Sequence, residues 1–158
     1  MLDPRLIKES FTVVEPVADK VAGYFYARLF LENPGVREMF PPAMDLQRER
    51  LFGALVRIVQ GVDRPEFLAN FLEQLGRDHR KFGAKAAHYE AVGRALIAAL
   101  RRYAGEAWTP EVEASWVAAY SFAAELMIDA ARRAGGHSAF AFCPANAKRK
   151  SRSAWKIP

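Results

Sequence analysis

The 158-residue sequence predicts an all-α fold. Apolar residues recur every three or four positions along most of the chain, and the alternation at period two that half-buried strands need is absent. β-branched residues are sparse, and no Asn-Gly or Asp-Gly pair marks a hairpin turn. A chain of this length with 51% hydrophobic residues can bury one core as a single domain. We therefore expect about six long helices or helix pairs.

The amino-terminal region is predicted to form two helices. Asp3 followed by Pro4 marks a helix start, because the carboxylate can accept hydrogen bonds from the first amides and proline already has a helical φ. Apolar residues continue at spacings of three and four, and Pro16 should bend or divide this helix. A second helix is expected over residues 19–33, where Pro34 ends it.

An irregular corner precedes the third predicted helix. Prolines preclude a regular helix over residues 34–44, so the large ring of Phe40 must pack against something at this corner. Asp45 is expected to cap the following helix, with Gln47 as the polar exception on its inward face. The apolar residues of that face are Leu51, Leu55, Ile58, Val59 and Val62.

The fourth predicted helix, over residues 65–83, has an apolar face that ends on a histidine. The residues of this face are Phe67, Leu68, Phe71, Leu72, Leu75, His79 and Phe82. A neutral imidazole aimed from a rigid helix into a dry pocket can bind a metal or a haem iron. A lone histidine on such a face is more often a hydrogen-bonded core residue, so both interpretations of His79 stay open at this point.

Two more helices complete the predicted bundle. The last one begins at Thr109-Pro110-Glu111, which supplies a side-chain acceptor, a proline in the first turn and an early acid, and it runs to the glycine pair 135–136. The inward residues of the two helices are Tyr89, Val92, Leu96, Ile97, Leu100, Tyr103, Val112, Trp116, Ala119, Tyr120, Ala123, Leu126, Met127 and Ala130.

Composition indicates a globular protein of the cytoplasm. Cys143 is the single cysteine and excludes an internal disulfide, and the amino terminus lacks the basic segment and apolar run of a secretory signal. No apolar stretch is long enough to cross a bilayer, so no membrane partner is expected. The net charge of +5 comes from residues 135–158, which carry five basic residues and no acid, while the other 18 basic residues balance 18 acidic ones. We interpret this segment as a flexible basic tail, with nucleic-acid binding through residues 148–156 as an alternative.

A set of short motifs is distributed along the predicted helices. They are Gly23-Tyr24-Phe25-Tyr26-Ala27-Arg28-Leu29-Phe30, Asn33-Pro34, Phe40, Gln47-Arg48-Glu49-Arg50-Leu51-Phe52, His79, and His88-Tyr89 with Val92-Gly93. This set resembles the globin domain of bacterial flavohaemoglobins and of their single-domain haemoglobin relatives, over about residues 1–133. The resemblance implies a globin fold of six to eight helices around a haem pocket, with a globin domain at residues 1–134 followed by the tail at 135–158.

The resemblance also implies roles for the inward polar residues. From the residues alone, Tyr26 could be a core tyrosine and Gln47 a residue of a helix start. By resemblance both would lie on the distal side of a haem b group, where they donate hydrogen bonds to a bound gas, and His79 would be the proximal ligand of the iron. The other implied roles belong to Phe40 stacked on the haem edge, Leu51 over the iron and Tyr89 beside the proximal histidine.

Two departures from the family pattern change what we expect of the chain. In the family, a glutamate on the last helix completes a hydrogen-bonded set with the proximal histidine and its neighbouring tyrosine, and that position falls at Ala131. We therefore expect reversible O2 binding with poor cleavage of peroxide O–O bonds. The chain also lacks a Gly-x-Gly-x-x-Gly run and strand-helix alternation, so we expect no reductase within it.

Basic residues follow the predicted ligand helix. Arg80, Lys81 and Lys85 are candidates for pairing with the haem propionates, and an ordinary solvated basic edge is an equally good interpretation. His88 receives no role.

Three functions remain open on the sequence. The first is a haem b globin that binds O2, NO and CO and serves nitric oxide dioxygenation to nitrate, or oxygen delivery, with electrons from a separate NAD(P)H-dependent flavin reductase. The second is a haem-based gas or redox sensor without turnover. The third is a haem-free helical domain that binds nucleic acid through its basic tail. Whether the protein is a monomer or a homodimer stays open.

Overall fold

The computed structural model describes residues 2–137. Within this range the chain forms six α-helices and three short 3-10 helices joined by short connections, and no strand occurs there. The elements are α1 (Pro4–Val14), η1 (Glu15–Val17), α2 (Ala18–Glu32), η2 (Pro34–Met39), α3 (Asp45–Gly61), α4 (Pro65–Lys81), α5 (Ala86–Ala104), η3 (Gly105–Ala107) and α6 (Pro110–His137). The predicted all-α class is confirmed. Of the predicted tail, residues 135–137 belong to α6 and the remainder lies outside the described residues.

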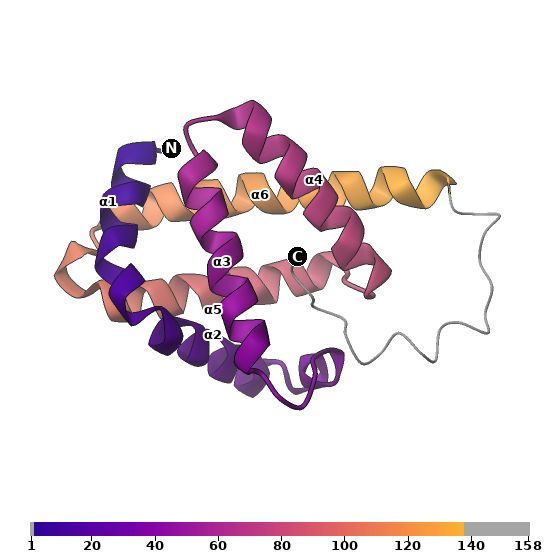
Figure 1. Cartoon of the computed structure of the whole chain (residues 1–158), viewed down its shortest axis with the longest axis horizontal. Helices are drawn as coiled ribbons and strands as arrows, with labels where there is room; N and C mark the ends of the chain where they lie inside the picture. Colours follow the sequence, from indigo (N-terminus) through magenta and orange to yellow (C-terminus); the bar gives the residue numbers. More distant parts are fainter. Residues whose placement is uncertain (1, 138–158) are drawn as a thin grey trace.

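The helices pack in crossing pairs. Figure 1 shows α4 crossing the long α6 and α2 lying along α5, and both pairs are in contact. The first helix, α1, contacts α3, α5 and α6, while α3 also contacts α2 and α4. No helix among the described residues is long and apolar enough to span a membrane.

Several predicted helix ends are confirmed. The carboxylate of Asp3 accepts from the amides of Arg5 at 2.9 Å and Leu6 at 3.4 Å, which caps α1. The hydroxyl of Thr109 accepts from the amide of Val112 at 3.2 Å and caps α6 in the same way. The proline in Glu15–Val17 divides the first helix from the second by a single 3-10 turn, as expected.

The predicted cap of α3 is wrong. Met44 occupies the cap position, with φ −103° and ψ −2°, and Asp45 is the first residue inside the helix. The Asp45 carboxylate instead accepts from the Arg48 guanidinium at 2.5 Å. A cap residue normally has extended backbone, and Met44 is already helical, so no side chain reaches back to the free amides. The negative charge of Asp45 in the first turn still interacts favourably with the positive end of the helix dipole.

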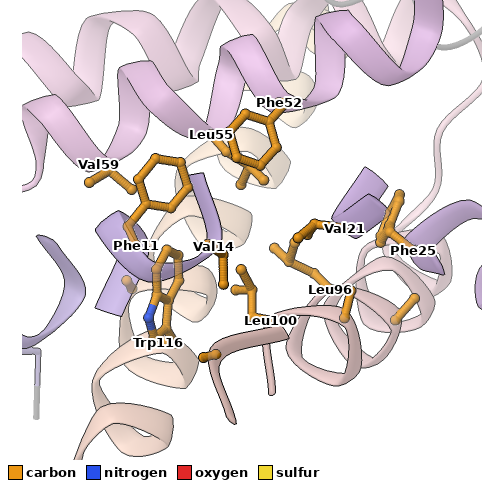
Figure 2. Close-up of a cluster of buried hydrophobic side chains, with 14 of the residues drawn as sticks. Phe11, Val14, Val21, Phe25, Phe52, Leu55, Val59, Leu96, Leu100 and Trp116 are labelled. Atoms are coloured by element: carbon orange, nitrogen blue, oxygen red, sulfur yellow. The ribbon is translucent and has the colours of Figure 1, made fainter. Parts of the chain in front are cut away.

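The main core lies where α1, α2, α3, α5 and α6 meet (Figure 2). Phe11 of α1 stacks on Phe52 of α3 with ring centroids 5.3 Å apart, and it also contacts Trp116 of α6 at 6.3 Å. The indole nitrogen of Trp116 donates to the Ser10 hydroxyl at 2.9 Å, so these two buried polar groups are paired with each other.

Two glycines allow α6 to approach its neighbours closely. A Cβ atom at Gly76 of α4 would lie 2.3 Å from the Met127 carbonyl oxygen of α6. A Cβ atom at Gly93 of α5 would lie 2.5 Å from a ring carbon of Tyr120, also on α6. Any larger residue at either position must push helices apart, so the spacing around α6 depends on these glycines.

The apolar face of α4 differs in part from the predicted one. Phe67 is 50% exposed, whereas Leu68, Leu72, Leu75 and His79 are buried. The buried face therefore begins at Leu68, one residue around the helix from the predicted start. Phe67 instead lies beneath the Arg64 guanidinium at 5.6 Å from the ring centroid, in a cation–π contact near the start of α4.

Candidate haem site

His79 lies in the last turns of α4 with 5% of its surface exposed. Its Nδ1 atom lies 2.7 Å from the carbonyl oxygen of Leu75, one helical turn earlier. A carbonyl oxygen can only accept, so Nδ1 carries the proton and donates it. In the neutral ring the lone pair is therefore on Nε2, which is the nitrogen a metal ion would coordinate.

Burial keeps this ring neutral at physiological pH. Desolvation lowers the pKa of His79 below the ordinary value of 6.5, against smaller upward contributions from the Leu75 hydrogen bond and the Asp78 carboxylate. A metal ion coordinates the neutral form of imidazole, so the environment holds His79 in the protonation state that a ligand needs.

A cavity of about 110 Å³ opens beside His79. Its other walls are mostly apolar and come from α3, α4, α5 and α6: Leu51, Ala54, Leu55, Ile58, Leu75, Tyr89, Val92, Leu96, Trp116, Ala119, Tyr120, Ala123, Ala124 and Met127. The cavity is smaller than the roughly 300–1,000 Å³ of typical ligand sites, so a porphyrin would displace side chains of its wall. The donor set fits haem, because an apolar slot with one correctly protonated imidazole is what an iron porphyrin requires.

Tyr26 and Gln47 form a second buried group. They are 5% and 3% exposed, and the Nε2 of Gln47 on α3 donates to the Tyr26 hydroxyl of α2 at 3.2 Å. Burial raises the pKa of Tyr26 well above its ordinary value of 10.0, and the Gln47 hydrogen bond only partly offsets this, so the phenol stays protonated. Phe40 packs against the Tyr26 ring with centroids 5.5 Å apart, and also against Phe30 at 5.3 Å.

The structure therefore places the predicted residues in two adjoining groups. Leu51, His79 and Tyr89 line the cavity described above, whereas Tyr26, Phe40 and Gln47 are not among its wall residues. The two groups are joined along α3, because Leu51 follows Gln47 by one helical turn.

Tyr89 forms part of the cavity wall beside the histidine. The centroids of the Tyr89 and His79 rings are 6.4 Å apart. The Tyr89 hydroxyl is buried and has no hydrogen-bond partner among the described residues. Burial raises the pKa of Tyr89 to about 12. On α6, Ala131 lies beside Tyr89 around a separate cavity, and the nearby Asp129 points into solvent with 65% of its side chain exposed.

The predicted propionate partners are all exposed. Lys81 pairs with Asp78 at 3.6 Å, and Arg80 lines the cavity beside Ala131. The backbone amide of Lys85 donates to Nδ1 of His88 at 2.9 Å, so His88, for which no role was predicted, contributes to the start of α5.

Two elements of the site were not predicted. The Leu75 carbonyl that orients His79 is a backbone atom, and the spacing of four residues between the two positions was the only signal for it. Arg132 lines the cavity beside Tyr89 together with residues of α4 and α5, and this grouping depends on how α6 crosses those helices.

A helical bundle with a buried, neutral histidine in the wall of an apolar cavity belongs to a class of helical proteins that can hold haem. The family model for globin matches residues 23–127 of the chain. The chain therefore belongs to the globin family, and it is a haem-binding globin domain related to flavohaemoglobins.

Named relatives support the same assignment. The flavohemoprotein of Rhodopirellula baltica is 33% identical over 127 residues, covering 78% of this chain and 31% of the relative. The flavohemoprotein of Bordetella pertussis is 31% identical over 134 residues, covering 81% of this chain and 33% of the relative. The chain thus spans about a third of the length of the curated relatives that it matches.

Solved structures show the same fold. A bacterial globin from Campylobacter jejuni superposes with a TM-score of 0.72 at 22% identity, over 84% of this chain and 96% of that one. An engineered carbene transferase, made from a candidate nitric oxide dioxygenase of Rhodothermus marinus, superposes with a TM-score of 0.78 at 22% identity, over 88% of this chain and 99% of that one. The predicted globin fold is confirmed.

Proposed function

We propose that this chain binds haem b through Nε2 of His79, binds O2, NO and CO beside Tyr26 and Gln47, and serves nitric oxide dioxygenation to nitrate. Oxygen delivery by the same site is included in this proposal. The haem would supply an iron centre that binds diatomic gases and exchanges electrons. The observation that carries the proposal is the buried hydrogen bond between Gln47 and Tyr26.

The direction of that hydrogen bond matters. Gln47 donates to the oxygen of Tyr26, and the hydroxyl proton of Tyr26 has no acceptor among the described residues. Tyr26 can therefore donate this proton to a guest that carries partial negative charge, as a polarised diatomic gas does. Because the group is buried, such a hydrogen bond would be little weakened by water.

The remaining residues fit supporting roles in this proposal. Phe40 would lie along the porphyrin edge and Leu51 over its centre, where apolar contact excludes water. Leu75 holds the His79 ring in place through its carbonyl. Lys81 and Lys85 are proposed to neutralise the propionates at the pocket mouth, with Arg80 as an alternative partner, and their exposed side chains keep any such pairs weak.

Sustained dioxygenation needs a source of electrons. A bound haem would supply the electron for this conversion of NO and O2 to nitrate, so repeated turnover would require the group to be reduced again. Among the described residues there is no strand, and so no βαβ unit to hold a dinucleotide. We propose a separate NAD(P)H-dependent flavin reductase as the donor, a globin domain at residues 1–134 and a cytoplasmic location.

The residues on the proximal side of the proposed haem disfavour peroxide cleavage. Tyr89 makes no hydrogen bond through its hydroxyl to any described residue, and the side chain at 131 is a methyl group. His79 therefore receives no added negative charge through Tyr89, and peroxide O–O cleavage should be slow. Peroxidase turnover and an Fe–His stretching frequency equal to those of relatives with an acid at this position would contradict this expectation.

The absorption spectrum of the ferrous protein with and without O2 is the first test. We expect a Soret band that shifts on oxygenation and is lost in His79→Ala, and a colourless wild-type protein would refute the proposal. The second test measures nitrate formed from NO in air with NADH and an added flavin reductase. Stable oxygen binding without nitrate formation would favour a sensor over a dioxygenase.

A further inference from the structure

A second cavity shares the wall residue Tyr89 with the cavity beside His79. Its volume is about 210 Å³. Arg80 reaches it from α4 and Arg132 from α6. The rest of its wall is apolar and consists of Ala84, Ala86, Ile128 and Ala131.

The charge around this cavity is unbalanced. Its lining includes two guanidinium groups and no carboxylate from the described residues. Arg80 makes no ion pair with any described residue. Arg132 has one carboxylate nearby, that of Asp129 at 4.0 Å, and the two side chains are 76% and 65% exposed. A pair at that distance and exposure holds the arginine only weakly, so both guanidinium groups remain available to another anion.

Tyr89 adds a buried donor without an acceptor. The residue is 7% exposed, and its hydroxyl has no hydrogen-bond partner among the described residues. A buried hydroxyl left unpaired destabilises the fold, and a phenol at neutral pH is protonated, so what it lacks is an acceptor. Tyr89 lines this cavity together with Arg80 and Arg132, so its hydroxyl is a third donor among the lining residues.

We propose that this cavity binds a short-chain monocarboxylate. The planar fork of a guanidinium group matches a carboxylate, so Arg80 and Arg132 would hold the two oxygens while the Tyr89 hydroxyl donates to one of them. The alanine and isoleucine side chains of the wall offer an apolar surface for a methyl or ethyl group. The site takes acetate or propionate better than chloride, which has no flat face for the guanidinium and no alkyl group for the apolar wall.

Acetate binding to the purified haem-loaded protein is the direct test. The iron is first reduced and saturated with CO, so that acetate cannot bind the metal, and acetate is titrated by saturation-transfer NMR at fixed ionic strength with chloride as the balancing anion. We expect a saturable signal from the acetate methyl protons. No saturable signal, or equal competition from chloride, would overturn the proposal.

Variants locate the binding site. Arg80→Gln and Arg132→Gln should each weaken acetate binding by about tenfold, and Tyr89→Phe by several-fold, because each removes one charge-assisted hydrogen bond. Arg133→Gln is the matched control, since Arg133 is the next residue on α6, pairs with Glu73 at 3.7 Å and does not line the cavity. Equal affinities in Arg132→Gln and Arg133→Gln would place the anion elsewhere.

Two further measurements separate the sources of the carboxylate. Ala131→Glu puts a covalent carboxylate into the wall and should abolish acetate binding, and retained binding would contradict the assignment. The haem propionates are the other carboxylates that could reach Arg80. Acetate that binds the haem-free protein but not the haem-loaded one would show that the cavity serves a propionate and would refute the proposal. The same acetate titration gives an answer even if the chain fails as a dioxygenase.

Discussion

Replacing Tyr26 by phenylalanine tests the proposed gas site most directly. The hydroxyl is buried, it accepts from Gln47 at 3.2 Å, and its own proton has no acceptor among the described residues. Tyr26→Phe should therefore remove one charge-assisted hydrogen bond to bound O2, which is worth about 1.5–3 kcal/mol. The ring remains, so its packing against Phe40 should be kept.

Part of that loss should be recovered by Gln47. Without the Tyr26 hydroxyl, the Gln47 amide loses that acceptor and can turn toward the gas, which returns about 0.5–1.5 kcal/mol. The net loss is about 1–2 kcal/mol, so the O2 dissociation rate should rise roughly tenfold, since each 1.4 kcal/mol corresponds to a factor of ten. Adding Gln47→Leu to Tyr26→Phe should remove the compensation and raise the rate again.

Stopped-flow replacement of O2 by CO measures this rate. Tyr24→Phe is the matched control, because Tyr24 lies on the same helix and its hydroxyl accepts from Arg28 at 3.0 Å at an exposed position. We expect the control to release O2 at the wild-type rate. A dissociation rate in Tyr26→Phe within about twofold of wild type would show that the hydroxyl does not reach the gas.

Three further predictions concern stability. The pKa of His79 is lowered below 6.5 in the folded chain, so unfolding binds a proton at acidic pH. The free energy of unfolding of the haem-free protein should therefore fall as the pH drops below 6.5. Denaturant titrations should show a smaller fall in the His79→Gln variant. Gly76→Ala should destabilise the fold by about 1–3 kcal/mol, because the added Cβ meets the Met127 carbonyl. Gly53→Ala adds a Cβ with nothing within 4 Å and should stabilise α3 by up to about 1 kcal/mol. Equal thermal midpoints of the two variants would contradict the packing argument. Asp3→Ala should lower the free energy of unfolding by about 1 kcal/mol, because it removes the side-chain cap of α1. An unchanged thermal midpoint would show that water replaces the carboxylate.

Helix starts were predictable where the local sequence alone decides them. At Asp3 and Thr109 an acceptor side chain stands before a proline, and both caps form as expected. At Asp45 the same reasoning failed, because capping depends on the backbone of the residue before it and Met44 is already helical. Phe67 shows a similar limit, since helical periodicity tolerates a rotation of one residue, and Phe67 lies under Arg64 at the surface instead of in the core.

The site was predictable to the extent that its residues share local signals. An imidazole at the end of an apolar face and a glutamine on another inward face led to His79 and Gln47, and both side chains are buried. The close approach of α6 to α4 and α5 left no such signal, because it depends on what stands opposite Gly76 and Gly93. The Arg132 cavity was missed for the same reason, since its wall is assembled from three helices.

The hydrogen bond that orients His79 ends on a main-chain oxygen. Replacing the Leu75 side chain would leave that oxygen in place for as long as the helix stays formed. The orientation of the imidazole is thus protected against substitution of the Leu75 side chain, and unwinding of the end of α4 would remove it. Fraying there would free the ring of His79, so the proposed iron site depends on the integrity of one helix end.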